Sequence, residues 1–342
     1  HKFFHWELTF ADIFYGRDEG GFDLILGNPP WLKVEWQEAG ILGDSNPLFN
    51  LRNLSASQLA TQRQQAFEDY PQLEAQWFAE CEGTEATQNF LNAMQNYPLL
   101  KGSQTNLFKC FLPVAWRVSS HQGVSGFLHP EGCYDDPKGR GLRAEIYKRL
   151  RAHYQFQNEL KLFPIANRAT YSINIYSFSS SISFNSISNL FHPKTIGLSA
   201  IHDGSGIVPG IKNDIENEWD MSGHVNRIII VNDQVLATFA KLYDEPGTPI
   251  EEARLPALHA NTLISVLEKF ANYPYRLGGL KGDYFSLEMW HETNAQQDHT
   301  IRRETKFPNS PKELILSGPH FFVGKPLHQT PRTICDTHRA YD

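Results

Sequence analysis

The sequence predicts an α/β fold, and three observations lead to this prediction. A mostly apolar run at 22–26 lies between glycines and has the pattern of a buried strand. A segment of helical periodicity covers 105–118, although Pro113 inside it is expected to kink or split the helix. A second apolar run at 123–130 ends in a proline, as a further strand would. Strands that alternate with helices are typical of α/β proteins.

The first strand leads directly into Asn28-Pro29-Pro30-Trp31. Two consecutive prolines cannot continue a hydrogen-bonded ladder, so the strand must end there. In open α/β sheets, ligands bind at the carboxyl ends of the strands. An aromatic amine is a poor nucleophile because its lone pair is delocalised, and two acceptors on its N–H bonds would localise that pair. The side-chain oxygen of Asn28 and the carbonyl of Pro29 can provide them, and Trp31 offers a stacking face. The alternative is an ordinary turn capped by prolines.

This quartet resembles the catalytic motif of amino-group DNA methyltransferases that use S-adenosylmethionine. The motif is shared with protein-glutamine and some RNA methyltransferases. The resemblance implies that Asn28, Pro29, Pro30 and Trp31 are catalytic. It also implies a fold, namely the carboxyl-terminal half of a Rossmann-like class I methyltransferase sheet with a helical insertion.

Two further stretches resemble the cofactor-binding motifs of the same family. Residues 8–14 have the pattern of a strand that ends in a turn. The resemblance implies that Asp12 accepts a hydrogen bond from the adenine of the cofactor and that Ile13 or Phe14 packs on its ring. Asp12 as a helix cap is the alternative. Asn106 stands where the family has an aspartate beside the cofactor, so this match is looser.

The end of the predicted sheet supplies one more candidate. A basic helix is expected over 142–153, followed by strands over 156–164 and 171–178. This pair resembles the antiparallel ending of the methyltransferase sheet, and Phe163 stands where the family stacks a phenylalanine on the extruded base. Phe163 would then hold the base together with Trp31, and a plain core position is the alternative.

His129 ends the strand where the family commonly has valine. We expect a neutral histidine there that caps a loop, because methyl transfer to an amine needs little base catalysis. Asn106 and His129, as departures from the family pattern, leave open a degenerate subunit without activity.

Composition sets broad bounds on function. The chain has 342 residues, of which 41% are hydrophobic and 20% charged, as in an ordinary globular protein. No apolar run approaches the roughly 20 residues of a membrane span, so we expect no membrane partner. Four cysteines without a paired spacing favour a reducing cytoplasm. His291-Glu292 lacks the second histidine of a zinc motif because Ala295 stands there, and no metal is expected.

The net charge is −7, but one segment is basic. Between 138 and 168 it carries Lys138, Arg140, Arg143, Lys148, Arg149, Arg151, Lys161 and Arg168. Such a stripe suits contacts to phosphates, although solvated helix faces explain the single residues equally well.

The expected organisation has three regions. These are a catalytic region over 1–180 with a helical insertion at about 40–100, a mixed α/β linker over 181–300, and the start of a target-recognition domain over 301–342. The glycine-rich cofactor loop of the family is not found before the quartet, so we expect a fragment of a longer protein. A permuted order that uses Gly204 and Gly206, after a strand beginning at Ile196, is the alternative, but Pro209 follows where a helix should begin.

The resemblance implies transfer of a methyl group from S-adenosylmethionine to the exocyclic N6 of a flipped adenine in duplex DNA. The implied setting is restriction-modification or phage defence, with a restriction nuclease or defence subunit as a further partner. The alternatives are an RNA methyltransferase, a protein-glutamine methyltransferase, and a degenerate DNA-binding subunit.

Overall fold

The structure is a computed structural model. It describes residues 4–15, 20–52, 54–103, 106–213, 218–280, 282–283, 291–302, 309–310 and 312. Contacts divide the chain into two units, His1–Tyr273 and Pro274–Asp342. The second unit has the short helices η5 (Leu277–Leu280) and α13 (Glu292–Gln297). Most of the segment expected to begin a target-recognition domain lies outside the described residues.

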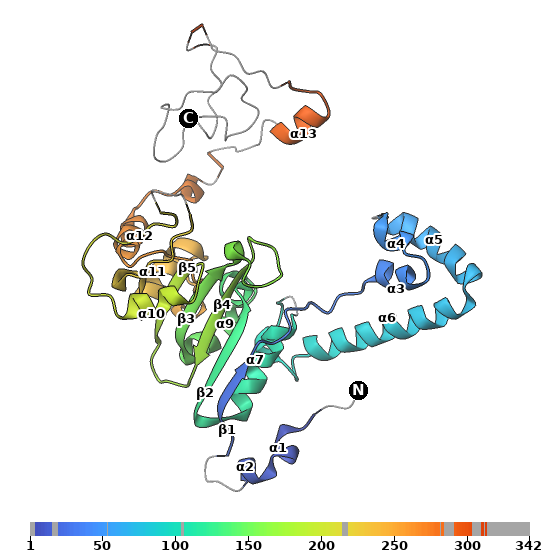
Figure 1. The fold of residues 1–342 in the computed structure, drawn as a ribbon, viewed down its shortest axis with the longest axis horizontal. Coiled ribbons are helices and arrows are strands. Elements are labelled where there is room, and N and C mark those ends of the chain that lie inside the picture. The colour runs from blue at the N-terminus through green and yellow to red at the C-terminus, as the bar shows by residue number, and fades with distance from the viewer. Residues whose placement is uncertain are drawn as a thin grey trace. The chain divides into compact units, whose positions relative to one another are not determined.

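A six-stranded mixed sheet organises the first unit (Figure 1). Its spatial order is β1-β2-β4-β3-β5-β6. β1 is parallel to β2 and β3 is parallel to β5, whereas the other three pairs are antiparallel. The strands are β1 (Phe22–Gly27), β2 (Ser119–Pro130), β3 (Leu150–Gln157), β4 (Thr170–Tyr176), β5 (Ser183–Leu190) and β6 (Ile229–Asn232). The α/β class and the antiparallel ending are confirmed. Two strands beyond residue 180 belong to the same sheet.

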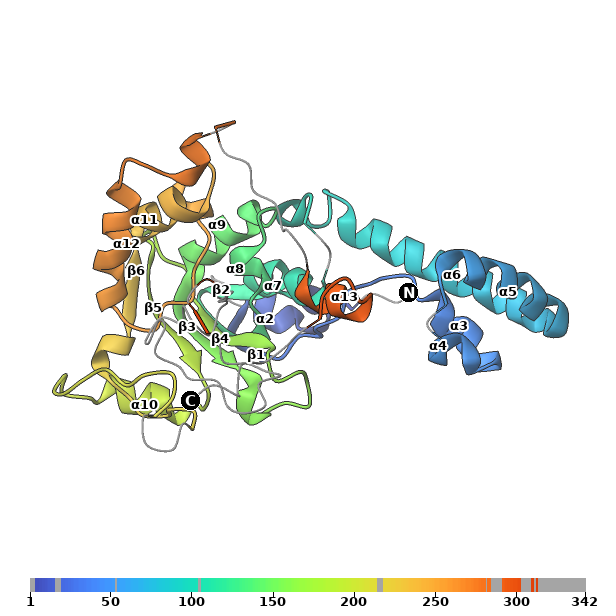
Figure 2. The same cartoon turned by 90° about the horizontal axis from the view of Figure 1, so that it is seen from above.

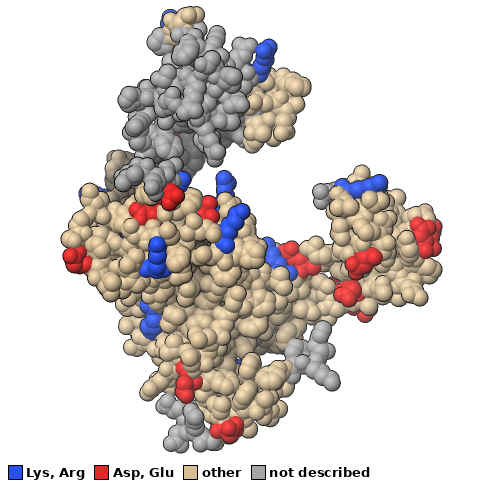
Figure 3. Space-filling model, viewed as in Figure 1, with Lys and Arg blue, Asp and Glu red and all other residues tan. Residues whose placement is uncertain are grey.

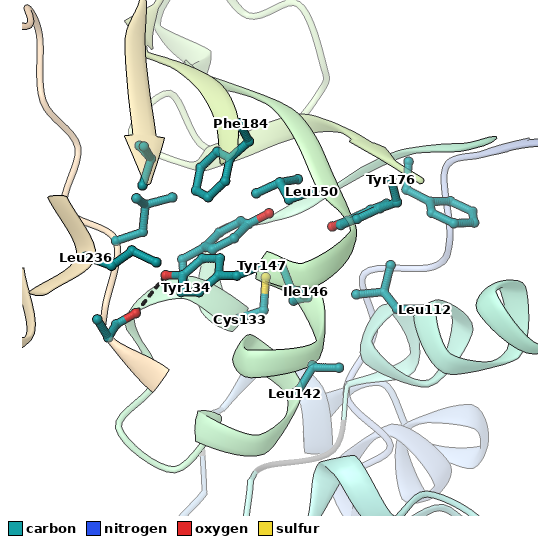
Figure 4. Close-up of a cluster of buried hydrophobic side chains, with 14 of the residues drawn as sticks. Leu112, Cys133, Tyr134, Leu142, Ile146, Tyr147, Leu150, Tyr176, Phe184 and Leu236 are labelled. Atoms are coloured by element: carbon teal, nitrogen blue, oxygen red, sulfur yellow. Dashed lines mark hydrogen bonds between the residues drawn. The ribbon is translucent and has the colours of Figure 1, made fainter. Parts of the chain in front are cut away.

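One face of the sheet is covered by helices. The core between them contains Leu112 of α7, Ile146 of α9 and Leu236 of α11, packed against Tyr176 and Phe184 of the sheet (Figure 4). The helices on this face are α7 (Leu107–Val118), α8 (Gly132–Asp135), α9 (Arg140–Arg149), α11 (Asp233–Tyr243) and α12 (Thr262–Asn272), with η4 (Ile250–Glu252) beside them. Pro113 lies inside α7 without splitting it.

The opposite face carries a smaller apolar cluster. Phe156, Tyr171 and Ile187 face it from the sheet, and Trp31 and Phe163 pack against them from loops. Helix α10 (Lys194–Ala200) and η3 (Val225–Arg227) lie near this cluster, and Ile196 of α10 joins it. The stretch that the permuted order would need as a strand is therefore helical.

The stretch expected as a helical insertion consists of helices (Figures 1 and 2), and they have a core of their own. Its helices are α3 (Glu38–Ser45), α4 (Leu48–Leu51), α5 (Ala56–Asp69) and α6 (Pro71–Asn92), and η1 (Pro98–Leu100) follows them. Helix α5 begins at a capping box, in which the hydroxyl of Ser55 accepts from the backbone of Gln58 and the Gln58 side chain accepts from the backbone of Ser55. The core of this insertion contains Leu42, Phe49, Leu59, Ala66 and Leu73.

The prediction of a strand over 8–14 is wrong. Two short helices, α1 (Trp6–Thr9) and α2 (Ala11–Tyr15), occupy this stretch. Trp6, Phe10 and Phe14 recur every four residues, and their rings all contact the ring of Phe22, with centroids 5.3 to 5.8 Å apart. The first and last of these side chains would lie about 26 Å apart along a strand but about 12 Å apart along helical turns, so the contact of all three with one ring favours helix over strand.

The boundaries expected around 142–164 are also wrong. The helix ends at Arg149, and the strand begins at Leu150 and ends at Gln157. Neither glycine nor proline separates the two elements. Residues 158–160 form η2 (Asn158–Leu160), and Phe163 lies in the loop after it.

Among the described residues, none of the helices is long and apolar enough to cross a membrane.

Candidate active site

The quartet lies at the carboxyl end of β1, beside the carboxyl half of β2. Gly27, the last residue of β1, pairs with Phe127, and a Cβ there would lie 3.2 Å from the Phe127 ring. The next side chain, Asn28, is exposed, whereas Pro29 is buried. Among the described residues, no hydrogen bond to the Asn28 amide is found. The strand therefore ends in an exposed carboxamide, which is followed directly by a buried proline.

Trp31 is tied to the neighbouring strand. Its indole Nε1 donates to the carbonyl of Leu128 at 3.3 Å. The chain then returns toward the start of α7, where the amide of Leu107 donates to the carbonyl of Leu32 at 2.9 Å. Lys33 and Asn106 form an isolated antiparallel bridge. These contacts bring Asn106 next to the quartet, and its role beside a cofactor stays a prediction.

Asn106 also has a structural role. Its side-chain oxygen accepts from the backbone N–H of Phe108 at 3.4 Å, which makes it the N-cap of α7. Asn106 can cap the helix and contact a cofactor at the same time, because the cap uses its side-chain oxygen and its side-chain nitrogen can still donate to a ligand.

Phe163 meets Trp31 from the other side of the site. The two ring centroids are 6.2 Å apart and the planes are inclined by 54°. The side-chain amide of Asn158 bonds both backbone groups of Phe163. The Phe163 N–H donates to Asn158 Oδ1 at 3.1 Å, and the Phe163 carbonyl accepts from Asn158 Nδ2 at 2.9 Å. Asn158 is fully buried, so this loop is fixed to the end of β3. The structure thus brings together the two residues expected to stack on the target base.

Tyr171, which the sequence reasoning did not select, belongs to the same cluster. Its ring lies 5.7 Å from Trp31 and 5.1 Å from Phe163, and it stacks on Phe156 at 5.6 Å. Tyr171 starts the strand expected from its alternating pattern, and only its position beside Pro130 in the sheet shows that it reaches the site.

Asp12, Ile13 and Phe14 are not brought together with the quartet. They lie on α2, and Phe14 packs on Phe22 at the amino end of β1 (Figure 1). A strand of six residues separates them from Asn28, a length of about 20 Å. Asp12 is exposed. Their role in binding a cofactor stays a prediction.

The helix-covered face of the sheet also carries a group of buried polar side chains behind the site. Glu131 is buried after β2, and its carboxylate accepts from Gln155 Nε2 at 3.1 Å and lies 3.2 Å from His153 Nε2. His153 Nδ1 lies 2.9 Å from the hydroxyl of Ser186. Desolvation raises the pKa of Glu131, but the attraction of His153 and hydrogen bonds from His153 and Ser172 outweigh it, so the pKa lies below its ordinary value.

His129 is fully buried in the same region. Its Nδ1 lies 2.9 Å from the carbonyl of Pro130, which can only accept, so Nδ1 carries the proton. Its Nε2 then accepts from the hydroxyl of Tyr176 at 2.8 Å. Burial lowers the pKa of His129 to about 4, against the opposing effects of the Pro130 hydrogen bond and the Glu131 charge. A neutral histidine with both nitrogens bonded is a structural group, in line with the expectation.

The basic segment does not form a single patch. Arg143 is fully buried and donates to the carbonyls of Cys133, Asp136 and Glu252. Lys148 and Arg149 share the carboxylate of Glu145. On the face in Figure 3, basic side chains of the described residues lie singly among acidic ones. The geometry therefore gives Arg143 a structural role and not a phosphate contact.

A polar cavity of about 680 Å³ opens next to the loop that follows the quartet. Val34 and Glu35 line it together with the end of α6 and the α8–α9 connection, and Asp136 and Lys138 are its charged residues on the latter side. None of Asn28, Pro29, Pro30 and Trp31 lines it.

Comparison with known proteins adds a limited finding. No model of a protein family matches the chain, and no curated protein does. Among solved structures it is similar to a methyltransferase subunit of a type I restriction-modification system from Streptococcus thermophilus, with 12% identity over 53% of this chain and 29% of that one, and a TM-score of 0.25. A structure of a type I restriction-modification system gives 11% identity over 84% of this chain and 47% of that one, with a TM-score of 0.32.

A third similar structure is the DNA-bound, ATP-dependent type ISP restriction-modification enzyme LlaBIII, with 12% identity and a TM-score of 0.25. It is matched over 48% of this chain and 10% of that one. The chain thus spans less than a third of the length of LlaBIII and of the Streptococcus thermophilus subunit. Similarity at this level does not establish a family.

Proposed function

We propose that this chain is part of a site-specific adenine DNA methyltransferase, which transfers a methyl group from S-adenosylmethionine to the exocyclic N6 of adenine in duplex DNA. The proposed setting is restriction-modification or phage defence. The observation that carries the proposal is the exposed Asn28 amide beside the Pro29 backbone at the carboxyl end of a parallel strand, with Trp31 and Phe163 alongside.

Asn28 and Pro29 can orient the amine that accepts the methyl group. The exocyclic amine has two N–H bonds, and both can donate, one to Asn28 Oδ1 and one to the Pro29 carbonyl. Bonded in this way, the nitrogen keeps its lone pair out of the ring and directed at the methyl group. Positioning of this kind contributes much of the acceleration in a group transfer. A strong base is not required, because the nitrogen becomes acidic once it is alkylated, and His129 is accordingly occupied by structural hydrogen bonds.

The donor side rests on the resemblance alone. Of the residues expected to hold S-adenosylmethionine, Asn106 lies next to the quartet, whereas Asp12, Ile13 and Phe14 lie at the other end of β1. The described residues therefore do not form one cofactor site, and the contacts proposed for Asn28, Pro29, Trp31 and Phe163 concern the target base only.

The base must leave the DNA stack to reach Asn28, at a cost of a few kcal/mol. Stacking on aromatic side chains is worth about 1–3 kcal/mol per base, which offsets this cost. Trp31 and Phe163 are placed to supply it. Duplex DNA is the partner that this arrangement suits, with a restriction nuclease or defence subunit as a second partner of the complete protein.

The test uses the full gene product that contains this chain, labelled S-adenosylmethionine, and duplex DNA of mixed sequence. DNA is then digested to nucleosides, and parallel reactions receive RNA or cell protein. Label in N6-methyladenine is expected. Label in RNA or in protein glutamine would contradict the proposal, and so would DNA binding without transfer of label to any acceptor, the result for a degenerate subunit.

A further inference from the structure

Four tyrosines of the sheet and its helices are fully or almost fully buried, and three of them have a partner for the hydroxyl. Tyr134 donates to Asn174 Oδ1 at 2.5 Å, Tyr147 donates to the Ala253 carbonyl at 2.7 Å, and the Tyr176 hydroxyl lies 2.8 Å from His129 Nε2. The fourth, Tyr171, is only 2% exposed, and its hydroxyl has no hydrogen-bond partner among the described residues.

A buried hydroxyl without a partner is unfavourable, and in native proteins it often marks a place that a ligand or water completes. The position of Tyr171 points to a ligand. Its ring contacts Trp31 and Phe163, the two residues proposed to hold the target base. Desolvation raises its pKa, so the group is a neutral O–H donor.

The rings of Trp31 and Phe163 are too close together and too steeply inclined to hold a base between them. Rings on both faces of a base are parallel and about 7 Å apart, twice the usual aromatic contact of about 3.5 Å. Trp31 and Phe163 are 6.2 Å apart and inclined by 54°. Asn158 fixes Phe163 through two hydrogen bonds, whereas a single one of 3.3 Å holds the side chain of Trp31. Entry of a base therefore displaces Trp31, which now lies over Tyr171.

We propose that the Tyr171 hydroxyl donates a hydrogen bond to N3 or N7 of the flipped adenine and so helps to select the base. This inference rests on the proposed function and goes beyond it. Asn28 and Pro29 accept from the exocyclic amine, which cytosine also has. A donor to N3 or N7 of adenine adds a contact that cytosine has no ring nitrogen to make, whereas a donor to N1 would meet N3 of cytosine equally well.

The test compares the full gene product with its Tyr171→Phe variant. The control is Tyr154→Phe, which removes a hydroxyl from β3 in the same apolar cluster. Among the described residues, no ring contact joins Tyr154 to Trp31 or Phe163. Three DNA preparations carry adenine analogues that each lack one ring nitrogen, at position 1, 3 or 7. Rates of methylation and melting temperatures are measured for all three proteins.

For Tyr171→Phe we expect kcat/KM on ordinary DNA to fall about tenfold or more, since one hydrogen bond to the base is lost. Its melting temperature should equal or exceed that of the wild type, because the lost hydroxyl had no partner. The analogue that lacks N3 or the one that lacks N7 should slow the wild type to the rate of the variant and leave the variant unchanged, whereas a response to the N1 analogue alone would overturn the claim of base selection. Tyr154→Phe should behave as the wild type does.

Three results would count against the inference in different ways. Methylation of ordinary DNA at the wild-type rate by Tyr171→Phe would overturn it and leave the proposed function intact. Absence of DNA methylation by the wild type would overturn the proposed function, and the inference would fall with it. A lower melting temperature with an unchanged analogue profile would show that Tyr171 is only structural.

Discussion

The indole of Trp31 donates a hydrogen bond to the carbonyl of Leu128, across the gap between the loop after β1 and the strand β2. This contact orients the ring over Tyr171 at 5.7 Å, so the aromatic face of the quartet is set by the sheet and not by the loop alone. Before a base enters, the sheet therefore sets the position of Trp31 through this one hydrogen bond.

Trp31 variants separate the ring from the hydrogen bond. Trp31→Ala removes the stacking face, and we expect kcat/KM for DNA methylation to fall about 10- to 100-fold, in line with the worth of one base stack. Trp31→Phe keeps an aromatic face without the N–H, so it should retain most of the activity. Steady-state rates with labelled S-adenosylmethionine measure both. Equal activity of Trp31→Ala and the wild type would show that this ring does not hold the base.

Glu131 is expected to stabilise the carboxyl edge of β2. Glu131→Ala leaves His153 and Gln155 without their partner in a buried site, at a cost of about 3 kcal/mol in the free energy of unfolding. Urea denaturation measures this cost. Because the pKa of Glu131 is lowered in the folded state, its contribution is present above the ordinary carboxyl range and is lost as pH falls through the folded value. A variant as stable as the wild type at neutral pH would refute this role.

His129 adds a second pH dependence with its own range. Its pKa is about 4 when folded and about 6.5 when unfolded, so the unfolded chain binds the extra proton first. Stability is therefore full above pH 6.5 and declines as pH falls toward 4, by about 3 kcal/mol. Unfolding free energies measured at several pH values should show this slope, and His129→Gln should flatten it. The same slope in both proteins would mean that another group titrates.

Asn106 can be examined as a helix cap independently of any cofactor. Asn106→Ala removes the acceptor for the backbone of Phe108 and should lower the free energy of unfolding by about 1 kcal/mol. Asn106→Asp keeps an acceptor there and should leave stability near that of the wild type. Thermal or urea unfolding distinguishes the two. A loss of the same size in both variants would contradict the capping role.

Much of the sheet was predictable because its strands carry clear local signals. Phe22 to Leu26 is apolar between glycines, and the strand from Tyr171 alternates, so both were placed correctly. The predicted range of β3 is shifted toward the carboxyl terminus, because two side chains that β3 buries, His153 and Gln155, are polar. Their burial depends on Glu131 from another part of the chain, which no local pattern reveals.

The site was predictable in part for the same reason. Asn28, Pro29, Pro30 and Trp31 are contiguous, and a resemblance marks them. Tyr171 carries no local signal, because its importance comes from long-range contacts to Trp31 and Phe163. The helices at 6–15 were misread as a strand, since the aromatic contacts to Phe22 that favour them are tertiary.

Asn28→Ala tests the central claim most directly, with Asn50→Ala, an exposed asparagine of the helical insertion, as the matched control. The full gene product and both variants are incubated with labelled S-adenosylmethionine and duplex DNA, and the nucleosides are separated. The account predicts label in N6-methyladenine for the wild type and Asn50→Ala, and none above background for Asn28→Ala at an unchanged melting temperature. Undiminished N6-methyladenine with Asn28→Ala would contradict it.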